Sequence, residues 1–373
     1  MDINTIETPS YIIDEDKLIK NLEILEAVRM RSGCKILLAQ KAFSAYYFYP
    51  LIGKYIDGVT ASGLYEAKLG AEEMGKENHV FAPAYKQSEI EELIKICDHI
   101  VFNSFSQYKK YENDVKNVSV GIRVNPEHST QEGHEIYDPC APCSRMGVRA
   151  CDFPKELPKN IEGLHFHTLC EQNSDALIST YEVFEKKFSR YFGEIKWLNF
   201  GGGHHITRED YDIDALVELI KYVRKKYNLE VYLEPGEAIA LNCGYLVTTV
   251  EDIVKNNMEI LILDASAACH MPDVLEMPYR PPLKNSGLPN EKKYTYRLAS
   301  RTCLAGDIIG DYSFDDKINV GDRLIFEDMA IYSMVKNNTF NGMPLPSISV
   351  MKKNGETEII KKFGYKDFKE RLS

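Results

Sequence analysis

No stretch of this 373-residue sequence is apolar for long enough to cross a bilayer, and the longest apolar runs, such as Ile260–Leu263, have the length of a strand. The amino terminus, MDINTIETPS, lacks the basic-then-apolar order of a signal peptide. We therefore expect a soluble, cytoplasmic protein that has no membrane partner.

Basic residues are too few and too scattered for a nucleic-acid-binding protein. Lysine and arginine total 45 against 56 aspartate and glutamate residues, which gives a net charge of −11, and no dense basic run occurs. The acidic balance suits a small cationic ligand. The nine cysteines are an odd number in a long chain, which favours free thiols over a disulfide framework.

The sequence also lacks the G-x-G-x-x-G fingerprint of a dinucleotide-binding fold. Up to about residue 236 it instead repeats a short apolar run followed by an amphipathic segment of helical length. Candidate strands begin at Lys35, Gly58, Val80, His99, Val118, Ile161, Lys196 and Glu230. Eight such units predict an α/β protein with a (β/α)8 barrel over residues 13–237, and an open doubly wound sheet is the alternative.

The pattern changes beyond Glu237 to strand-like runs without clear long helices, such as GYLVTTVEDIV and EILILDAS. This change predicts a β domain over residues 238–373. The polar stretch from Pro126 to Asn160 is too long for a simple connector, and we expect a functional loop. It contains Cys140-x-x-Cys143, which has the spacing of a metal or redox pair but no second pair, so we interpret it as part of the loop.

Polar residues gather where the predicted barrel strands end, which is where barrels of this type carry their chemistry. Lys41 follows the first strand, Gly201–Gly203 the seventh, and Glu234 and Gly236 the eighth. Consecutive glycines let backbone N–H groups approach an anion closely. A lysine, an anion cradle and a carboxylate on one rim suggest pyridoxal 5'-phosphate (PLP): Lys41 as the covalent link, the glycines on the phosphate and Glu234 on the pyridinium nitrogen.

A competing reading uses the histidines at the same strand ends. His165, His167, His204 and His205, with Glu234 nearby, could form the metal cluster of a barrel hydrolase. Lys41 and the glycines would then be incidental. Arg123, near the end of the fifth strand, is either a contact of the cofactor ring or part of a salt bridge on the rim.

Six motifs in order along the chain resemble one known family. They are LLAQKAF around Lys41, GLHFHTLCE at 163–171, NFGGGHH at 199–205, EPGEA at 234–238, TCLAGD at 302–307 and AIYSMVKNNTFNG from Ala330. Together they resemble the PLP-dependent alanine-racemase-type decarboxylases, which include diaminopimelate and ornithine decarboxylases. With HMPD at 270–273, they are most similar to the carboxynorspermidine/carboxyspermidine group of polyamine biosynthesis.

The resemblance implies a PLP barrel of the alanine racemase type, a C-terminal β domain that includes residues 1–12, and a homodimer with shared active sites. It also implies that His167 stacks on the cofactor ring, that Cys303 reprotonates the carbanion, and that Tyr332 lies near the phosphate. A thiol suits this acid role because its usual pKa, about 8.5, keeps it mostly protonated near neutral pH. No metal is implied.

Two positions depart from the diaminopimelate and ornithine enzymes, which usually have serine where this chain has Cys170 and arginine where it has Glu237. The missing arginine disfavours a substrate with a second carboxylate. We therefore expect release of CO2 from carboxynorspermidine or carboxyspermidine to give norspermidine or spermidine. Substrate contacts are expected from Glu237, His270, Asp273 and Asp307. A decarboxylase of diaminopimelate or another basic amino acid and a non-catalytic PLP carrier are the remaining alternatives.

Overall fold

The computed structural model describes residues 5–131 and 135–373. The chain divides into two compact units, one formed by residues 21–239 and the other by residues 1–20 with 240–373. The sequence pattern suggested 13–237 for the first unit. Within the described residues, no helix is both long and apolar enough to pass through a membrane.

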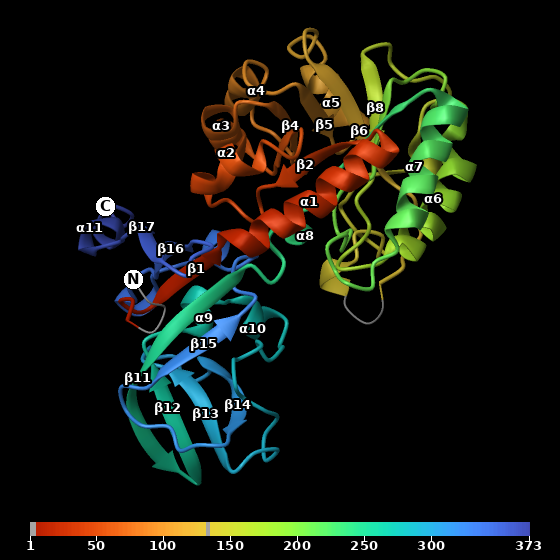
Figure 1. The fold of residues 1–373 in the computed structure, drawn as a ribbon. Helices are drawn as coiled ribbons and strands as arrows, with labels where there is room; N and C mark the ends of the chain where they lie inside the picture. The colour runs from red at the N-terminus through yellow and green to blue at the C-terminus, as the bar shows by residue number, and fades with distance from the viewer. Residues whose placement is uncertain (1–4, 132–134) are drawn as a thin grey trace. The chain divides into compact units, whose positions relative to one another are not determined.

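The first unit is a closed barrel of eight parallel strands (Figure 1). Pairing of β10 with β2 and of β5 with β6 closes it, which confirms the predicted (β/α)8 fold and excludes the open sheet. All eight predicted strands are present. They are β2 (Lys35–Ala39), β3 (Gly58–Ala61), β4 (Glu77–Phe81), β5 (His99–Phe102), β6 (Ser119–Asn125), β8 (Ile161–His165), β9 (Trp197–Asn199) and β10 (Glu230–Leu233).

Helices alternate with these strands along the chain and surround the barrel. In α7, Asp212 caps the first turn by accepting from the Ala215 N–H, and basic residues fill the last turn. The helix ends at Asn228, which is left-handed with φ 54°. The helices are α1 (Glu15–Ser32), α2 (Tyr49–Ile52), α3 (Leu64–Leu69), α4 (Gln87–Leu93), α5 (Phe105–Tyr111), α6 (Ser174–Phe188), α7 (Ile213–Tyr227) and α8 (Glu237–Ala240). The long loop after β6 carries the short strand β7 (Val148–Arg149).

Aromatic side chains fill the barrel at the amino-terminal ends of its strands. The Trp197 ring lies so close to β8 that a Cβ at Gly163 would come within 2.0 Å of it, and one at Gly121 within 2.3 Å. Trp197 stacks on His99, and His99 stacks on His79. This packing fills the amino-terminal end of the barrel, so the polar groups at the carboxyl-terminal ends are the ones available for chemistry.

The second unit is a sheet domain, as predicted, with strand order β14-β13-β12-β11-β1-β16-β17 and β15 paired with β11. The early strand β1 pairs with β11 and β16, so residues from the start of the chain complete this sheet. Strands β14 and β17 were not predicted. The strands are β1 (Ser10–Asp14), β11 (Gly244–Asn256), β12 (Met258–Leu263), β13 (Tyr294–Ser300), β14 (Ile308–Phe314), β15 (Arg323–Glu327), β16 (Ser347–Met351) and β17 (Thr357–Lys361), with short helices α9 (Ala267–His270), α10 (Asp273–Glu276) and α11 (Tyr365–Lys369).

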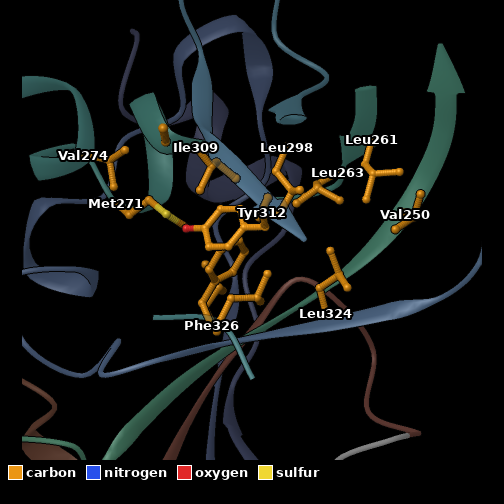
Figure 2. Close-up of a cluster of buried hydrophobic side chains, with 14 of the residues drawn as sticks. Val250, Leu261, Leu263, Met271, Val274, Leu298, Ile309, Tyr312, Leu324 and Phe326 are labelled. Atoms are coloured by element: carbon orange, nitrogen blue, oxygen red, sulfur yellow. The ribbon is translucent and has the colours of Figure 1, made fainter. Parts of the chain in front are cut away.

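The sheet domain has its own hydrophobic core, part of which Figure 2 shows around Tyr312 and Phe326. Both rings are buried, and the Tyr312 hydroxyl donates to the Pro281 carbonyl at 2.7 Å. Burying a large apolar side chain stabilises a fold by about 1.5–3 kcal/mol. The cluster therefore stabilises the sheet domain, from which the loops with the late sequence motifs extend. A barrel-only PLP carrier would need no such domain.

Candidate active site

The carboxyl-terminal strand ends bring the predicted cofactor residues of the barrel together. The Lys41 Nζ lies 3.4 Å from the His167 Nε2, so the residue after β2 meets the one after β8. The other imidazole nitrogen of His167, Nδ1, accepts from the Gly202 N–H at 2.9 Å. Lys41, His167 and the glycine loop at 201–203 therefore form one continuous group.

The electrostatic surroundings of Lys41 destabilise the charged form of its amine. Its side chain reaches solvent, yet the protein groups packed around the amine, followed by the positive charge of Arg123, lower the pKa of Lys41. A neutral amine is the nucleophilic form. This environment suits the predicted covalent attachment to a carbonyl group.

Arg123 is buried in β6, and its guanidinium binds the backbone of His167. Its Nη2 donates to the His167 carbonyl at 3.0 Å, and its guanidinium lies 4.6 Å from the centre of the Phe81 ring. Burial lowers the pKa of Arg123 to about 10, which still leaves it charged at neutral pH. Its guanidinium also interacts electrostatically with Glu234, whose charge raises the pKa of Arg123 against the effect of burial, so the choice between a cofactor-ring contact and a rim salt bridge stays a prediction.

The glycine loop combines left-handed backbone angles with a lack of room for any side chain. Gly201 and Gly203 have φ values of +67° and +81°. A Cβ at Gly203 would lie 2.0 Å from the Leu169 carbonyl oxygen. The N–H groups of Gly201 and Gly202 are hydrogen-bonded to Asn199 and His167, whereas those of Gly203 and Gly236 have no acceptor within the described residues. These two N–H groups fit a phosphate.

Glu234 lies at the end of β10 with its carboxylate almost completely buried. Oε1 accepts from the Asn199 Nδ2 at 2.8 Å, and Oε2 lies 3.4 Å from the His165 Nε2, which makes no hydrogen bond. Burial by itself raises the pKa of Glu234, but His165 and Asn199 more than offset it and hold the pKa well below its usual range. The result is an ionised, buried carboxylate with one oxygen open to a further donor, which fits the pyridinium nitrogen of PLP.

The four histidines proposed for a metal centre do not form a ligand cluster in the part of the chain that the structure describes. The His204 Nε2 lies 3.2 Å from the Phe200 carbonyl, and the His205 Nε2 lies 3.6 Å from the Glu237 Oε1. Among the described residues, a ligand-like cluster occurs instead at the opposite ends of the strands, in Glu77, His79 and His99. The rings of His79 and His99 stack at 3.9 Å and 19°, so they cannot both direct in-plane lone pairs at one ion without reorienting. The barrel therefore gives the metal-hydrolase reading no support.

Cys303 and Tyr332 belong to loops of the sheet domain. The Cys303 side chain is exposed, and its backbone N–H donates to the Asn341 Oδ1 at 2.7 Å. Tyr332 is half-buried and has the left-handed φ value of 47°. A hydrogen bond to Asn341 therefore anchors the Cys303 backbone, while the Cys303 side chain stays accessible.

The three substrate candidates of the sheet domain have partners within that domain. Both ring nitrogens of His270 contact backbone groups, of Ser266 and Pro344, and burial lowers the pKa of His270 to about 4. Asp307 accepts from three hydroxyls at 2.6 Å and from one N–H at 3.1 Å. Asp273 forms an ion pair with Lys336. These contacts shape the HMPD and CLAGD segments.

Glu237 is the one substrate candidate in the barrel unit. It opens α8, directly after the loop that carries Glu234 and Gly236, and its side chain is 17% exposed. Asn199, which the motif analysis passed over, also belongs to the site because it contacts both Glu234 and Gly201. A polar residue that ends a buried strand, separated by one residue from three glycines, was the available signal.

Comparison with known proteins agrees with this geometry. Residues 10–330 match the model of the family described as pyridoxal-dependent decarboxylase, C-terminal sheet domain. The chain is 45% identical to carboxynorspermidine/carboxyspermidine decarboxylase of Campylobacter jejuni, over 98% of both chains, and 41% identical to carboxyaminopropylagmatine decarboxylase of Synechocystis, over 99% and 96%.

Solved structures give the same result. Carboxynorspermidine decarboxylase of Campylobacter jejuni, complexed with norspermidine, matches with a TM-score of 0.92 and 43% identity, over 98% of this chain and all of the other. Diaminopimelate decarboxylase of Helicobacter pylori matches with a TM-score of 0.84 at 18% identity, over 99% and 97%, which shows the shared fold. The chain therefore belongs to the pyridoxal-dependent decarboxylases, and pyridoxal 5'-phosphate is its cofactor.

Proposed function

We propose that this carboxy-lyase removes CO2 from a carboxylated triamine, carboxynorspermidine or carboxyspermidine, and releases norspermidine or spermidine for polyamine biosynthesis. The observation that carries the proposal is the full-length similarity to a carboxynorspermidine/carboxyspermidine decarboxylase in a barrel where Lys41, His167 and Glu234 are correctly grouped. Neither a PLP carrier nor a metal hydrolase accounts for both the full-length similarity and this group of barrel residues.

Each barrel residue has one task in this proposal. Bound PLP supplies an electron sink for the pair of electrons left when CO2 departs. Lys41 would hold the cofactor covalently. Glu234 would keep the pyridinium nitrogen protonated, and His167 would cover the ring. The Gly203 and Gly236 N–H groups would bind the phosphate.

Cys303 completes the reaction by donating its thiol proton to the carbon that has lost CO2, and the resulting thiolate regains a proton from solvent. In this proposal Tyr332 would lie near the phosphate. The exposed thiol supports this role because an acid that meets a substrate must be accessible.

Glu237 is the carboxylate that receives a distal ammonium group of the substrate. It lies close to Glu234 in sequence and is only partly buried. Asp273 and Asp307 have partners at hydrogen-bond distance, whereas the ion pair of Glu237 with the His205 Nε2 is longer, at 3.6 Å. We therefore assign Asp273 and Asp307 to shaping the loops rather than to direct substrate contact.

We expect purified, PLP-loaded enzyme to use carboxynorspermidine or carboxyspermidine at least about 30-fold better, in kcat/KM, than diaminopimelate, ornithine or lysine. A carboxylate placed beside Glu237 costs about 2 kcal/mol or more, which corresponds to this ratio. Manometric or coupled CO2 assays on one panel measure it. Carboxyaminopropylagmatine belongs in the panel because of the 41% identical relative. Diaminopimelate as the best substrate would refute the proposal.

The Glu237→Gln substitution should raise KM for the triamine about 10- to 100-fold with a smaller change in kcat. The amide keeps the size of the side chain but removes the charge that meets the ammonium. Glu209→Gln is the matched control, since Glu209 is an exposed carboxylate of the barrel unit, on the connection between β9 and α7, outside the proposed substrate site. An unchanged KM in the Glu237 variant would remove this residue from the substrate site.

The enzyme works as a homodimer in the cytoplasm, in our proposal, and each active site takes Cys303 from the partner subunit. The exposure of the thiol and of the apolar neighbours Leu304, 43% exposed, and Phe340, 48% exposed, supports a protein contact at this loop. All nine cysteines are free thiols, which supports a reducing compartment.

A further inference from the structure

One buried amide connects two parts of the candidate cofactor site. Asn199 is the last residue of β9 and is completely buried. Its Nδ2 donates to the Glu234 Oε1 at 2.8 Å, and its Oδ1 accepts from the Gly201 N–H at 2.8 Å. The strand itself is held on both sides, because Asn199 lies opposite His165 of β8 and Tyr232 of β10. The amide therefore has a fixed position.

The contact with Glu234 determines how that carboxylate is presented. With Oε1 bound to Asn199, Oε2 is the oxygen left for another donor, and His165 lies 3.4 Å from it without a hydrogen bond. The donor is also neutral. An arginine or lysine in its place would cancel the negative charge of Glu234, whereas an amide orients the carboxylate and leaves its charge intact for a pyridinium group.

The contact with Gly201 determines the start of the glycine loop. Gly201 is left-handed, and its N–H turns inward to Asn199 while the Gly202 N–H turns to His167. These two bonds direct the first two N–H groups into the protein, and Gly203 is then the first of the three glycines whose N–H is available to an anion. Loss of the Asn199 oxygen would leave the Gly201 N–H buried without an acceptor.

We propose that Asn199 is a positioning residue that sets both the pyridinium partner Glu234 and the phosphate loop. The inference rests on the proposed function, which assigns those two roles. Asn199 does not act on the substrate itself. Its effect reaches the reaction through Glu234 and Gly201.

Two substitutions separate the two contacts. Asn199→Leu is similar in size and removes both hydrogen bonds. Asn199→Asp keeps the oxygen that accepts from Gly201 but replaces the donor to Glu234 with a second carboxyl group. Asn78→Asp is the matched control, because Asn78 is equally buried in β4 and its amide donates to two backbone carbonyls, at 2.8 and 2.9 Å.

The first measurement is the dissociation constant of PLP for each folded variant. It is determined by equilibrium dialysis without borohydride, with the bound PLP read by its absorbance. We expect Asn199→Leu to weaken PLP binding about 10-fold, since it disturbs the glycine loop and Glu234 together. Asn199→Asp should stay within about 3-fold of the parent, since the Gly201 contact survives. Asn78→Asp should match the parent in PLP affinity even if its melting temperature falls.

The second measurement is the pH profile of kcat. Asn199→Leu should lower kcat about 10- to 100-fold with KM within about 2-fold, because the buried amide touches no substrate. In Asn199→Asp, two adjacent carboxyl groups share a proton and titrate as a pair. A new ionisation should appear, with kcat highest on the acid side, where the shared proton replaces the amide hydrogen.

Parent-like PLP affinity and a parent-like pH profile in both Asn199 variants would overturn the proposal. The same new ionisation in Asn78→Asp would also overturn it, by showing general damage to the barrel. If Asn199→Leu does not fold, Asn199→Asp decides the matter through its pH profile. A parent enzyme that binds PLP but decarboxylates none of the triamines would refute the proposed function, and the PLP dissociation constants would still test Asn199.

Discussion

The Lys41→Ala enzyme should show no measurable decarboxylation while it stays folded and still binds PLP weakly. The amine that holds the cofactor is lost, but the Gly203 and Gly236 N–H groups and the Glu234 carboxylate remain. Covalent capture by Lys41 and binding of the phosphate are separate contributions. Turnover assays, equilibrium dialysis of PLP and thermal unfolding measure the three quantities.

Borohydride reduction followed by peptide mass spectrometry provides a direct test. It should place a pyridoxyl group on Lys41 in the parent and on no residue in the variant. Lys35→Ala is the matched control, since Lys35 begins the same strand that Lys41 follows and pairs with Glu77 at 2.8 Å. That variant should lose some stability but keep the label and the activity. Parent-like turnover after Lys41→Ala would remove Lys41 from its assigned role.

The barrel could be predicted because its strands and helices repeat a pattern that depends on neighbouring residues. Each predicted strand is a short, largely apolar run, and the polar residues and glycines that follow several of them are brought to one rim by the closed sheet. The sheet domain was harder. Strand β14, IIGDYSF, contains Gly310 and Asp311, and β17, TEIIK, is short and largely polar, so pattern alone did not identify either.

The partners of the polar groups could not be predicted, because they come from distant parts of the sequence. Asp307 is surrounded by hydroxyls that include Ser266, 41 residues earlier, and Asp273 is paired with Lys336, 63 residues later. From sequence, both looked like carboxylates free for a cationic substrate. Asn199 was missed for a related reason, since its role depends on a contact with Glu234, which lies 35 residues later at the end of the neighbouring strand.

Mixing two inactive variants should restore activity if each site is shared between subunits. Lys41 belongs to the barrel unit and Cys303 to the sheet domain, and the proposed dimer takes them from different chains. In a mixed dimer of Lys41→Ala and Cys303→Ala, one site contains both substitutions and the other contains neither. The two-fold interface makes this outcome independent of which chain carries which change.

Random pairing gives about half mixed dimers, each with one intact site of two, so about a quarter of the parent activity should return. Native mass spectrometry of isotope-labelled chains first shows that subunits have exchanged. The yield of triamine product is then measured, and the residual yield of each variant alone is subtracted. If one chain supplied both residues, every mixed dimer would hold only damaged sites and the yield would not rise above that of the separate variants. Failure to complement despite proven exchange, or a monomer at assay concentration, would refute the shared site while leaving Lys41 and PLP in place.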